Sequence, residues 1–308
     1  TIIDGNQNGS VVTLTSAQDI ATLCGFTIQN GHAAGYFPNG GVGGGIDCAG
    51  SSPTLKNLII RNNSANQWGG GIFSRSTSPT FKNLIIRDNV ADNGGGINLN
   101  GSSPHLENVT IIGNSSSGYG GGISCNSGSP ILVNVTISGN SGGSGIYCNN
   151  IAVTLINSIV WGNGSTNINV SSGGIISTYS NIEGGYSGIG NIDLDPLFVD
   201  TVNGDYRLSN FSPCIGAGLD TSIIPALDLD GNPRPNPAGS NPDMGAYENS
   251  LATPLILGCT DALAYNYDPL ADVDDGSCLY CNLSSTTFIV DESAIGAANG
   301  KVNLTVSG

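Results

Sequence analysis

The run Gly-Gly-Gly-Ile stands at residues 43–46 and returns at 69–72, 94–97 and 120–123, and a variant, Gly-Ser-Gly-Ile, follows at 143–146. The isoleucines that end these runs are separated by 26, 25, 26 and 23 residues. A second run, Asn-Leu-Ile-Ile at 57–60 and 83–86, has related copies at 108–111, 134–137 and 157–160 and shifts through the same steps. Two markers that shift together indicate one structural repeat.

This repeat predicts a right-handed parallel β-helix, an all-β solenoid in which each repeat is one coil. Its β-branched residues show no helical period, and the Leu-x-x-Leu-x-Leu frame of a leucine-rich repeat is absent. Each strand should pair with the equivalent strand one coil on, about 4.8 Å away, so equivalent residues stack in columns. We expect an interior built from these columns, for example Ile46, Ile72, Ile97, Ile123 and Ile146.

A column of asparagines recurs at the same period. An Asn at a turn tolerates unusual backbone angles, and its amide can bond to the next Asn and to the backbone. Metal or sugar binding is the alternative, but a repeating column is what the architecture alone demands. The predicted structural Asn ladder consists of Asn63, Asn89, Asn114, Asn140 and Asn163.

Composition limits the partners of the chain. With 308 residues, a net charge of −15 and only 8 Lys and Arg, it lacks a basic surface for nucleic acid. It also has no apolar run long enough to span a membrane, so we expect no direct membrane insertion. Eight cysteines favour an oxidising, extracellular or cell-surface location. Because the chain opens at Thr1 inside a strand-like run, we expect a piece of a longer polypeptide.

Further motifs follow the repeats in a fixed order. They are Asp-Pro-Leu-Phe-Val-Asp at 195–200, Gly-Asp-Tyr-Arg-Leu at 204–208, Ser-Pro-Cys-Ile at 212–215, Asp-Leu-Asp-Gly-Asn-Pro-Arg at 228–234 and Asp-Met-Gly-Ala-Tyr-Glu at 243–248. Together with the repeats, they resemble the choice-of-anchor Q family of bacterial surface β-helix proteins, within the pectate-lyase-like superfamily. The resemblance implies β-helix coils over 1–170 and further coils with a cap over 171–250.

The composition changes after residue 250. Gly-Cys-Thr-Asp at 258–261 and Asp-Asp-Gly-Ser-Cys at 274–278 resemble a short Cys-rich module of secreted Bacteroidota proteins, which we place at 251–281. Residues 282–308 resemble the start of an immunoglobulin-like repeat of gliding-motility adhesins. The combination implies export by the type IX route and a cell-surface adhesin or fibre.

We find no credible catalytic site in the sequence. Some superfamily relatives cleave acidic polysaccharides on the outer face of stacked strands, but a fold alone does not transfer function. The outward position of the Asn-x-x-Ile strand is uncharged throughout, whereas such a groove needs convergent carboxylates or cations. His32 and His105 have no evident partner cluster and are predicted to be surface or turn residues. Lys82 and Glu107 share a column and should form a salt bridge between coils.

Calcium is the cofactor that the acidic turns would suit, although no cofactor is required by the sequence. Asp228 and Asp230 precede Gly231, and Asp272, Asp274 and Asp275 precede Gly276. Neither run matches the EF-hand loop, and an ordinary Asp-Gly turn is the alternative that we favour. The second run is the better candidate for Ca²⁺.

Two disulfides are predicted. Cys125 and Cys148 occupy one column on adjacent coils, where the strand spacing falls inside the disulfide range of Cα separations. Cys259 and Cys278 bracket a segment too short for a core of its own, which needs a covalent link. Cys281 is an alternative partner there, and the partners of Cys24, Cys48 and Cys214 stay open.

The sequence therefore favours a non-enzymatic structural or adhesive segment over two alternatives. These are a polysaccharide lyase or glycoside hydrolase, and a non-catalytic carbohydrate-binding module. A β-helix with low charge and many Asn, Ser and Thr suits weak multivalent contact with glycans or other cell-surface molecules. Assembly of identical chains into a fibre is a further expectation.

Overall fold

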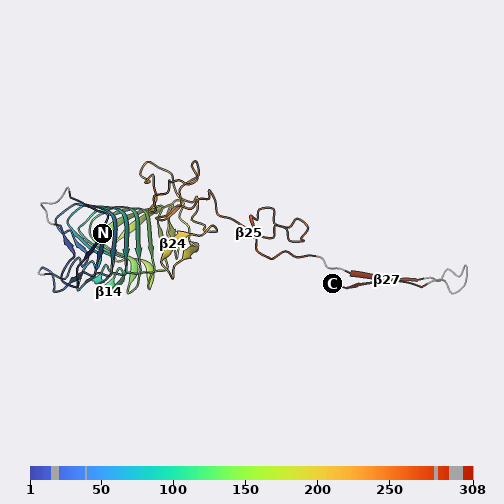
Figure 1. The fold of residues 1–308 in the computed structure, drawn as a ribbon, viewed down its shortest axis with the longest axis horizontal. Helices are drawn as coiled ribbons and strands as arrows, with labels where there is room; N and C mark the ends of the chain where they lie inside the picture. Colours follow the sequence, from blue (N-terminus) through green and yellow to red (C-terminus); the bar gives the residue numbers. More distant parts are fainter. Residues whose placement is uncertain (15–20, 39, 281–283, 291–300, 308) are drawn as a thin grey trace, which may run out of the picture. The chain divides into compact units, whose positions relative to one another are not determined.

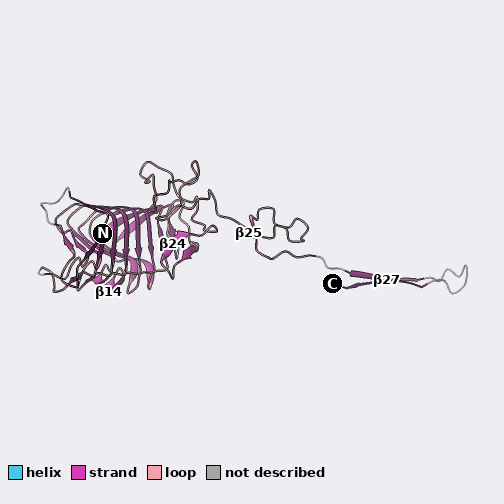
Figure 2. Cartoon of the chain, viewed as in Figure 1, coloured by secondary structure: helices cyan, strands magenta, loops and turns pink. Residues whose placement is uncertain are grey.

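The computed structural model describes residues 1–14, 21–38, 40–280, 284–290 and 301–307. Its regular elements are all strands, and the described residues contain no helix (Figures 1 and 2). The chain divides into two compact units, Thr1–Pro254 and Leu255–Gly308. The first unit is a parallel β-solenoid of about 7 turns, so the predicted fold class is confirmed.

Three parallel sheets form the sides of the solenoid within the described residues. Sheet A contains β1 (Ile2–Asp4), β3 (Thr22–Cys24), β4 (Thr27–Gln29), β7 (Thr54–Arg61), β10 (Thr80–Arg87), β13 (His105–Ile112), β16 (Ile131–Ser138), β18 (Ile151–Ile156), β19 (Ile159–Trp161), β21 (Gly173–Thr178) and β22 (Asn181–Ile182). Sheet B contains β5 (His32–Ala33), β8 (Ser64–Ala65), β11 (Val90–Asn93) and β14 (Ser115–Tyr119). Sheet C contains β2 (Val12–Thr13), β6 (Ile46–Asp47), β9 (Ile72–Arg75), β12 (Ile97–Asn100), β15 (Ile123–Asn126), β17 (Ser144–Asn149) and β20 (Thr166–Val170).

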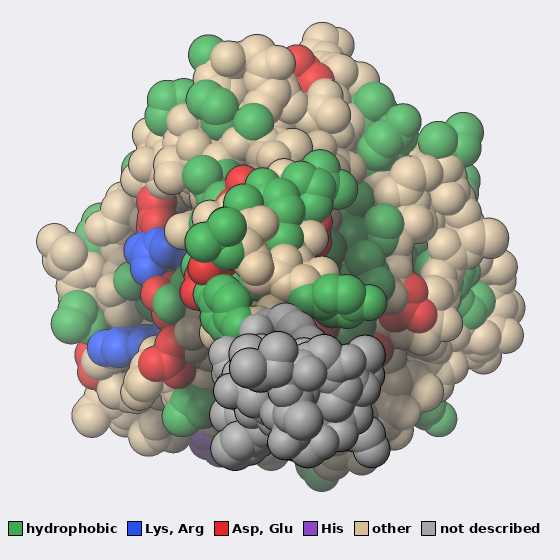
Figure 3. Space-filling view, turned by 90° about the vertical axis from the view of Figure 1, so that its right-hand side faces the viewer, with side chains coloured by type: hydrophobic (Ala, Val, Ile, Leu, Met, Phe, Trp, Pro, Cys, Tyr) green, Lys and Arg blue, Asp and Glu red, His purple; other side chains and the backbone are tan. Residues whose placement is uncertain are grey.

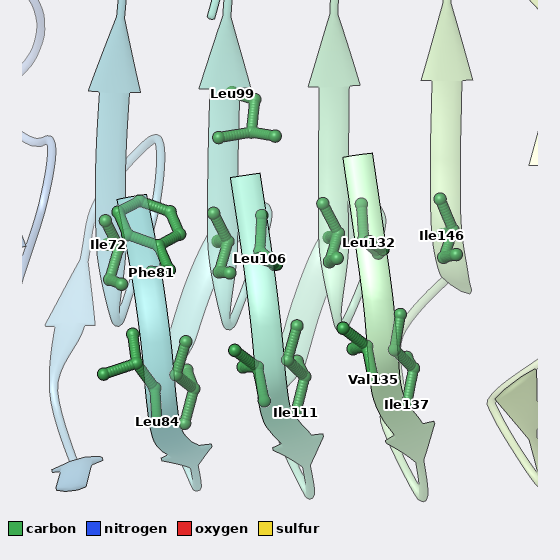
Figure 4. Close-up of a cluster of buried hydrophobic side chains, with 14 of the residues drawn as sticks. Ile72, Phe81, Leu84, Leu99, Leu106, Ile111, Leu132, Val135, Ile137 and Ile146 are labelled. Atoms are coloured by element: carbon green, nitrogen blue, oxygen red, sulfur yellow. The ribbon is translucent and has the colours of Figure 1, made fainter. Parts of the chain in front are cut away.

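The predicted register is confirmed. Ile97 pairs with Ile72 on one side and with Ile123 on the other, and all three side chains are buried. Leu84 pairs with Leu58 and Val109 in sheet A, on the opposite side of the same interior. Figure 4 shows buried side chains of equivalent positions, such as Phe81, Leu106 and Leu132, repeating from coil to coil between the sheets. The core is therefore a stack of equivalent residues.

The glycine triplets have a steric cause. Gly94 adopts a φ of +68°, a left-handed conformation in which a side chain is strained. A Cβ atom at Gly95 would lie 2.3 Å from the carbonyl oxygen of Ser115, and one at Gly96 would lie 2.6 Å from that of Gly122. In these coils the chain enters sheet C so close to the next coil that a side chain would collide with its backbone, and only the last repeat departs from the triplet, with Ser144 at the middle position.

A continuous row of buried asparagine amides joins sheets A and B. Asn89 Nδ2 donates to Asn114 Oδ1 at 3.0 Å, and Asn114 Nδ2 donates to Asn140 Oδ1 at 3.0 Å. Each of these amides also donates to a backbone carbonyl of the preceding coil, as Asn114 does to Ile86 O. The row runs from Asn63 to Asn163 and ends on Asn167 Oδ1. These are the residues that the sequence assigned to a ladder.

The chain leaves the coil path near the C-terminal end of the solenoid. Coils continue through β21 and β22, and Tyr186 then packs on the end of the core. From about residue 194 the chain leaves the coil path and lies on the outer face of sheet A, where it includes the antiparallel pair β23 (Phe198–Asp200) and β24 (Asp205–Leu208). Residues 194–251, called the C-terminal segment below, therefore cover a side of the solenoid.

The second unit contains two short pairings. Strands β25 (Leu257–Gly258) and β26 (Val273–Asp274) are parallel, and Cys259 is bonded to Cys278 beside them, as predicted. Strands β27 (Ser284–Val290) and β28 (Lys301–Ser307) form an antiparallel pair. Residues 281–283 and 291–300, which hold Cys281 and part of the expected adhesin repeat, lie outside the described residues.

Replacing a central ladder residue should destabilise the solenoid. Asn114→Ala removes two donated amide bonds and leaves the buried backbone amide of Asn89 without its acceptor. Unpaired buried polar groups cost about 1–3 kcal/mol each, so we expect a loss of about 2–4 kcal/mol in the free energy of unfolding. Urea unfolding followed by circular dichroism measures it.

The matched control is Asn66→Ala, which changes a half-buried asparagine outside the ladder. It should change the free energy of unfolding by less than about 0.5 kcal/mol. Equal losses in the two variants would show that the ladder contributes nothing specific.

Candidate functional site

A second asparagine column attaches the C-terminal segment to sheet A. Asn134 Nδ2 donates to the carbonyl oxygens of Asp243 and Gly245, at 3.1 Å each. Asn157 Nδ2 donates to Leu219 O, and Asn157 Oδ1 accepts from Leu219 N. The asparagines of this column adopt positive φ angles near +50°, which the strand requires where it bends. They are Asn57, Asn83, Asn108, Asn134 and Asn157.

The same segment buries the outward face of the last coils. Thr110, Thr136 and Ile159, which the repeat places on the outside of the strands, are at most 1% exposed. A Cβ atom at Gly245 would lie 2.8 Å from both Thr136 Oγ1 and Ile159 Cδ1, so the backbone touches the sheet directly. A second apolar cluster forms there from Ile159, Leu208, Cys214, Ile215 and Met244.

Four charged side chains gather inside this segment. Arg234 Nη1 lies 2.9 Å from Glu248 Oε1, and both side chains are 0% exposed. Arg234 also donates to the carbonyl oxygens of Asp243 and Gly245, the same two acceptors that Asn134 uses. The carboxylate of Asp243 accepts from the amides of Gly216 and Asn249, and that of Asp228 accepts from the amide of Glu248. The cluster joins 228–249 into one folded piece.

Burial changes the acidity of this cluster. Loss of hydration raises the pKa of Asp243 to about 6 and that of Glu248 to about 7, against the opposing effect of Arg234. Burial also lowers the pKa of Arg234. These groups contact the backbone and one another, so their hydrogen bonds and ion pair hold the C-terminal segment together.

The predicted calcium ligands are engaged in hydrogen bonds and ion pairs of their own units. Asp228 belongs to the buried cluster, and Asp230 Oδ2 accepts from Arg207 Nε at 2.7 Å. Asp272, Asp274 and Asp275 each accept a backbone amide, from Ile256, Gly276 and Ser277 respectively. Within the described residues, no group of three or more His, Cys, Asp or Glu side chains is placed to hold one metal ion. Calcium binding stays a prediction.

The structure does not form the predicted bond between Cys125 and Cys148. The two residues are register partners in sheet C, as expected, but both are buried free thiols. Their side chains leave in-register strands in parallel, so their Cβ atoms stay about 4.8 Å apart, beyond the roughly 3.8 Å typical of a disulfide. A hydrogen bond to Cys148, together with burial, raises the pKa of Cys125. Cys24, Cys48 and Cys214 are also free.

The histidines have partners that the sequence argument missed. His105 Nε2 lies 3.0 Å from Glu107 Oε1, because residues two apart in a strand share a face. Lys82 Nζ lies 2.6 Å from Glu107 Oε2, which is the expected salt bridge between coils. The bond to His105, with help from Lys82, holds the pKa of Glu107 down at about 2. His32 Nδ1 lies 2.8 Å from Ser64 Oγ.

A groove of about 390 Å³ lies on the outer face of sheet C. Its lining includes three aromatic residues, Trp68, Tyr119 and Tyr147, and the rings of the two tyrosines stack with centroids 4.5 Å apart. The remaining lining residues are amides and one hydroxyl: Asn93, Asn98, Asn100, Ser124, Asn126 and Asn149. We call this the aromatic–amide groove. Sequence reasoning missed it, although the outward position after the repeating isoleucine, Phe73, Asn98, Ser124 and Tyr147, does not repeat.

Comparisons with known proteins leave the family open. No protein-family model and no solved structure matches the chain. Ribulose bisphosphate carboxylase/oxygenase activase A, chloroplastic, from Hordeum vulgare is 46% identical over 61 residues, or 20% of this chain. The chain spans 13% of the length of that protein, too little to carry a function across. The described part of the chain contains no helix of the length and apolarity needed to cross a membrane.

The buried carboxyl groups predict a pH dependence of stability. The folded pKa values of Asp243 and Glu248 lie above their values of 3.8 and 4.5 in an unfolded chain. Their contribution is complete below the unfolded values and is lost as pH rises through the folded values. We therefore expect the free energy of unfolding to fall by about 1–3 kcal/mol between about pH 5 and about pH 8, as measured by urea unfolding.

Two variants check the assignment. Glu248→Gln should flatten this slope by removing one of the two titrating groups, whatever its effect on stability at a single pH. Glu183→Gln, at an exposed carboxyl group, should keep the slope of the unmodified protein. A slope that survives in Glu248→Gln would assign the pH dependence to other groups.

Proposed function

We propose that this chain is a structural and adhesive segment of an extracellular surface protein or filament, which attaches its carrier to surfaces, cells or glycans. The observation that carries the proposal is the in-register solenoid, whose coils share one apolar core and one buried asparagine row. Each inner coil is bonded to two neighbours, so the stack behaves as a stiff element. Repeated side chains on a stiff element suit multivalent attachment.

The character of the surface supports weak contact with uncharged partners. On the face drawn in Figure 3, uncharged polar side chains and backbone predominate, and the Lys and Arg side chains lie beside acidic ones. Ion pairs among the described residues include Lys82 with Glu107 and Arg207 with Asp230. Cations that are paired with acids, in a chain of net charge −15, leave no positive surface for steering an anionic ligand.

The covered face of sheet A supports a role without catalysis. The polysaccharide-cleaving alternative would place acids or bases on the outside of the stacked strands. In the coils that contain Thr110, Thr136 and Ile159, the C-terminal segment occupies that position. The nearby carboxylates of Asp243 and Glu248 are held by backbone amides and Arg234. We infer that this region stabilises the solenoid.

An extracellular location is part of the proposal. The bond between Cys259 and Cys278 favours an oxidising compartment. The resemblance of the motifs at 195–248 to choice-of-anchor Q proteins, and of 258–278 to a secreted Cys-rich module, supports export by the type IX route.

The test is an attachment assay with a parallel activity assay. Beads coated with the whole chain should attach to immobilised polysaccharides or cell surfaces, with a steep dependence on coating density because many weak contacts add up. Beads coated with the unfolded chain are the control. Incubation of the same protein with polygalacturonate and Ca²⁺ should release neither unsaturated nor reducing ends.

Two results would contradict the proposal. Densely coated beads that attach no better than the unfolded control would remove the adhesive role. Saturable release of sugar ends, lost in a variant with one acidic residue changed, would make the chain an enzyme.

A further inference from the structure

The aromatic–amide groove has a polar floor with an unsatisfied hydroxyl group. Asn98 and Ser124 are register partners on neighbouring coils, and their side chains point outward because Ile97 and Ile123 beside them face the core. Ser124 is 1% exposed, and its Oγ has no hydrogen-bond partner. Buried polar groups nearly always find partners, so an unpaired hydroxyl on the lining of the groove is a position at which a ligand group would complete the hydrogen bonding.

Aromatic pairs stand at both ends of this floor. Phe73 is the register partner of Asn98 at one end, and Trp68 stacks on it with ring centroids 5.9 Å apart. Tyr147 is the partner of Ser124 at the other end, and Tyr119 stacks on it. Three coil steps separate Phe73 from Tyr147, or about 14 Å at the strand spacing. Tyr119 is 54% exposed, so its ring presents a face to solvent.

A row of half-buried amides borders the groove. Asn100 pairs with Asn126, and Asn126 pairs with Asn149, so three amides stand one coil apart. Each amide supplies a donor and an acceptor. Asn149 Nδ2 reaches Asn126 Oδ1 only at 3.4 Å, at the long limit of a hydrogen bond, so this row is looser than the buried ladder.

We propose that the aromatic–amide groove binds a neutral glycan through stacking of a sugar ring on Tyr119, apolar contact with Trp68, and hydrogen bonds to Asn98, Ser124 and the amide row. The Trp68 ring itself packs between Phe73 and Phe37, with centroids 5.9 and 5.7 Å away. The inference rests on the proposed adhesive function and names its ligand class. Aromatic faces carry partial negative charge and attract the polarised C–H groups of a pyranose ring. Sugar hydroxyls both donate and accept, which matches amides and a serine.

The charge of the lining selects against other ligands. None of the nine residues that line the groove is charged. An anionic polysaccharide or a nucleic acid would find no cation there, and the net charge of −15 would repel it. The volume of about 390 Å³ lies in the range of small-ligand pockets.

The experiment is electrophoresis of the whole chain in native gels that contain one soluble polysaccharide each. The neutral probes are xyloglucan, mixed-linkage β-glucan, galactomannan and dextran, and polygalacturonate is the anionic probe. We expect retardation by at least one neutral probe and none by polygalacturonate. The chain has two tryptophans, so in Trp161→Phe the fluorescence of Trp68 reports binding, and it should change with the retarding probe.

Two variants place the binding in the groove. Tyr119→Ala should weaken retardation by at least about 10-fold, the loss expected when an aromatic anchor of a binding site is truncated. Ser124→Ala should weaken it roughly 3- to 10-fold without loss of folding stability, because its hydroxyl makes no bond in the free protein. The matched control is Tyr265→Ala, which removes a 91% exposed tyrosine in the second unit and should leave retardation unchanged.

The outcomes separate this inference from the proposed function. Retardation that is equal in the unmodified protein, Tyr119→Ala and Ser124→Ala would overturn the groove as the site and leave the adhesive role standing. Retardation by polygalacturonate alone, or by no probe at all, would overturn the neutral-glycan class. The bead assay then decides independently whether the chain attaches to anything.

Discussion

Hydrogen bonding between equivalent strands at constant register is the interaction on which the whole first unit depends. Each coil repeats the backbone of the one before it, so a side chain packs against the side chain at the equivalent position, which is often the same residue. Only some residue types are stable when stacked on copies of themselves. Isoleucine packs on isoleucine, and asparagine can bond to asparagine since its amide both donates and accepts. The stacked cysteines Cys125 and Cys148 stay free thiols, since the strand spacing holds their Cβ atoms farther apart than is typical of a disulfide. Like charges also stack, as Lys56 does beside Lys82, until Glu107 interrupts the column and pairs with Lys82.

The sequence predicted the features that strand register determines. It predicted few of the contacts between parts of the chain that do not repeat. The core columns, the buried ladder and the salt bridge of Lys82 follow from residues about one coil apart, so periodicity was enough to find them. The docking of the C-terminal segment depends on contacts that do not recur, such as those from Asn134 to Asp243 and Gly245 across more than 100 residues. The partnership of His105 with Glu107 was within reach, because alternation along a strand puts residues two apart on one face.

The two asparagine columns show that one residue type has two structural roles in the same repeat. At the turn between sheets A and B, an asparagine is enclosed and bonds along the stack. At the bend in sheet A, asparagines hold positive φ angles, and those near the end of the solenoid turn their amides outward to carbonyls of the C-terminal segment. Folding of the C-terminal segment buries the side chains of Arg234 and Glu248 together. A buried ion pair gains little net stability over apolar packing, but it does restrict which arrangement the segment can adopt, since either partner alone would be a buried unpaired charge.

The outer faces of sheets A and C therefore differ. The difference coincides with the outward positions at which residues stop recurring from coil to coil. The C-terminal segment covers much of the outer face of sheet A. The outward side chains that it buries, Thr110, Thr136 and Ile159, are small or apolar. On sheet C, the inward column keeps isoleucine in coil after coil, while the outward column beside it changes from Phe73 to Asn98, Ser124 and Tyr147. Stacking alone explains residues that recur; it gives no reason for an aromatic, an amide and a hydroxyl to follow one another at equivalent sites. A serine hydroxyl left without a partner on that floor is a cost to the free protein, which a ligand with hydroxyl groups of its own would relieve.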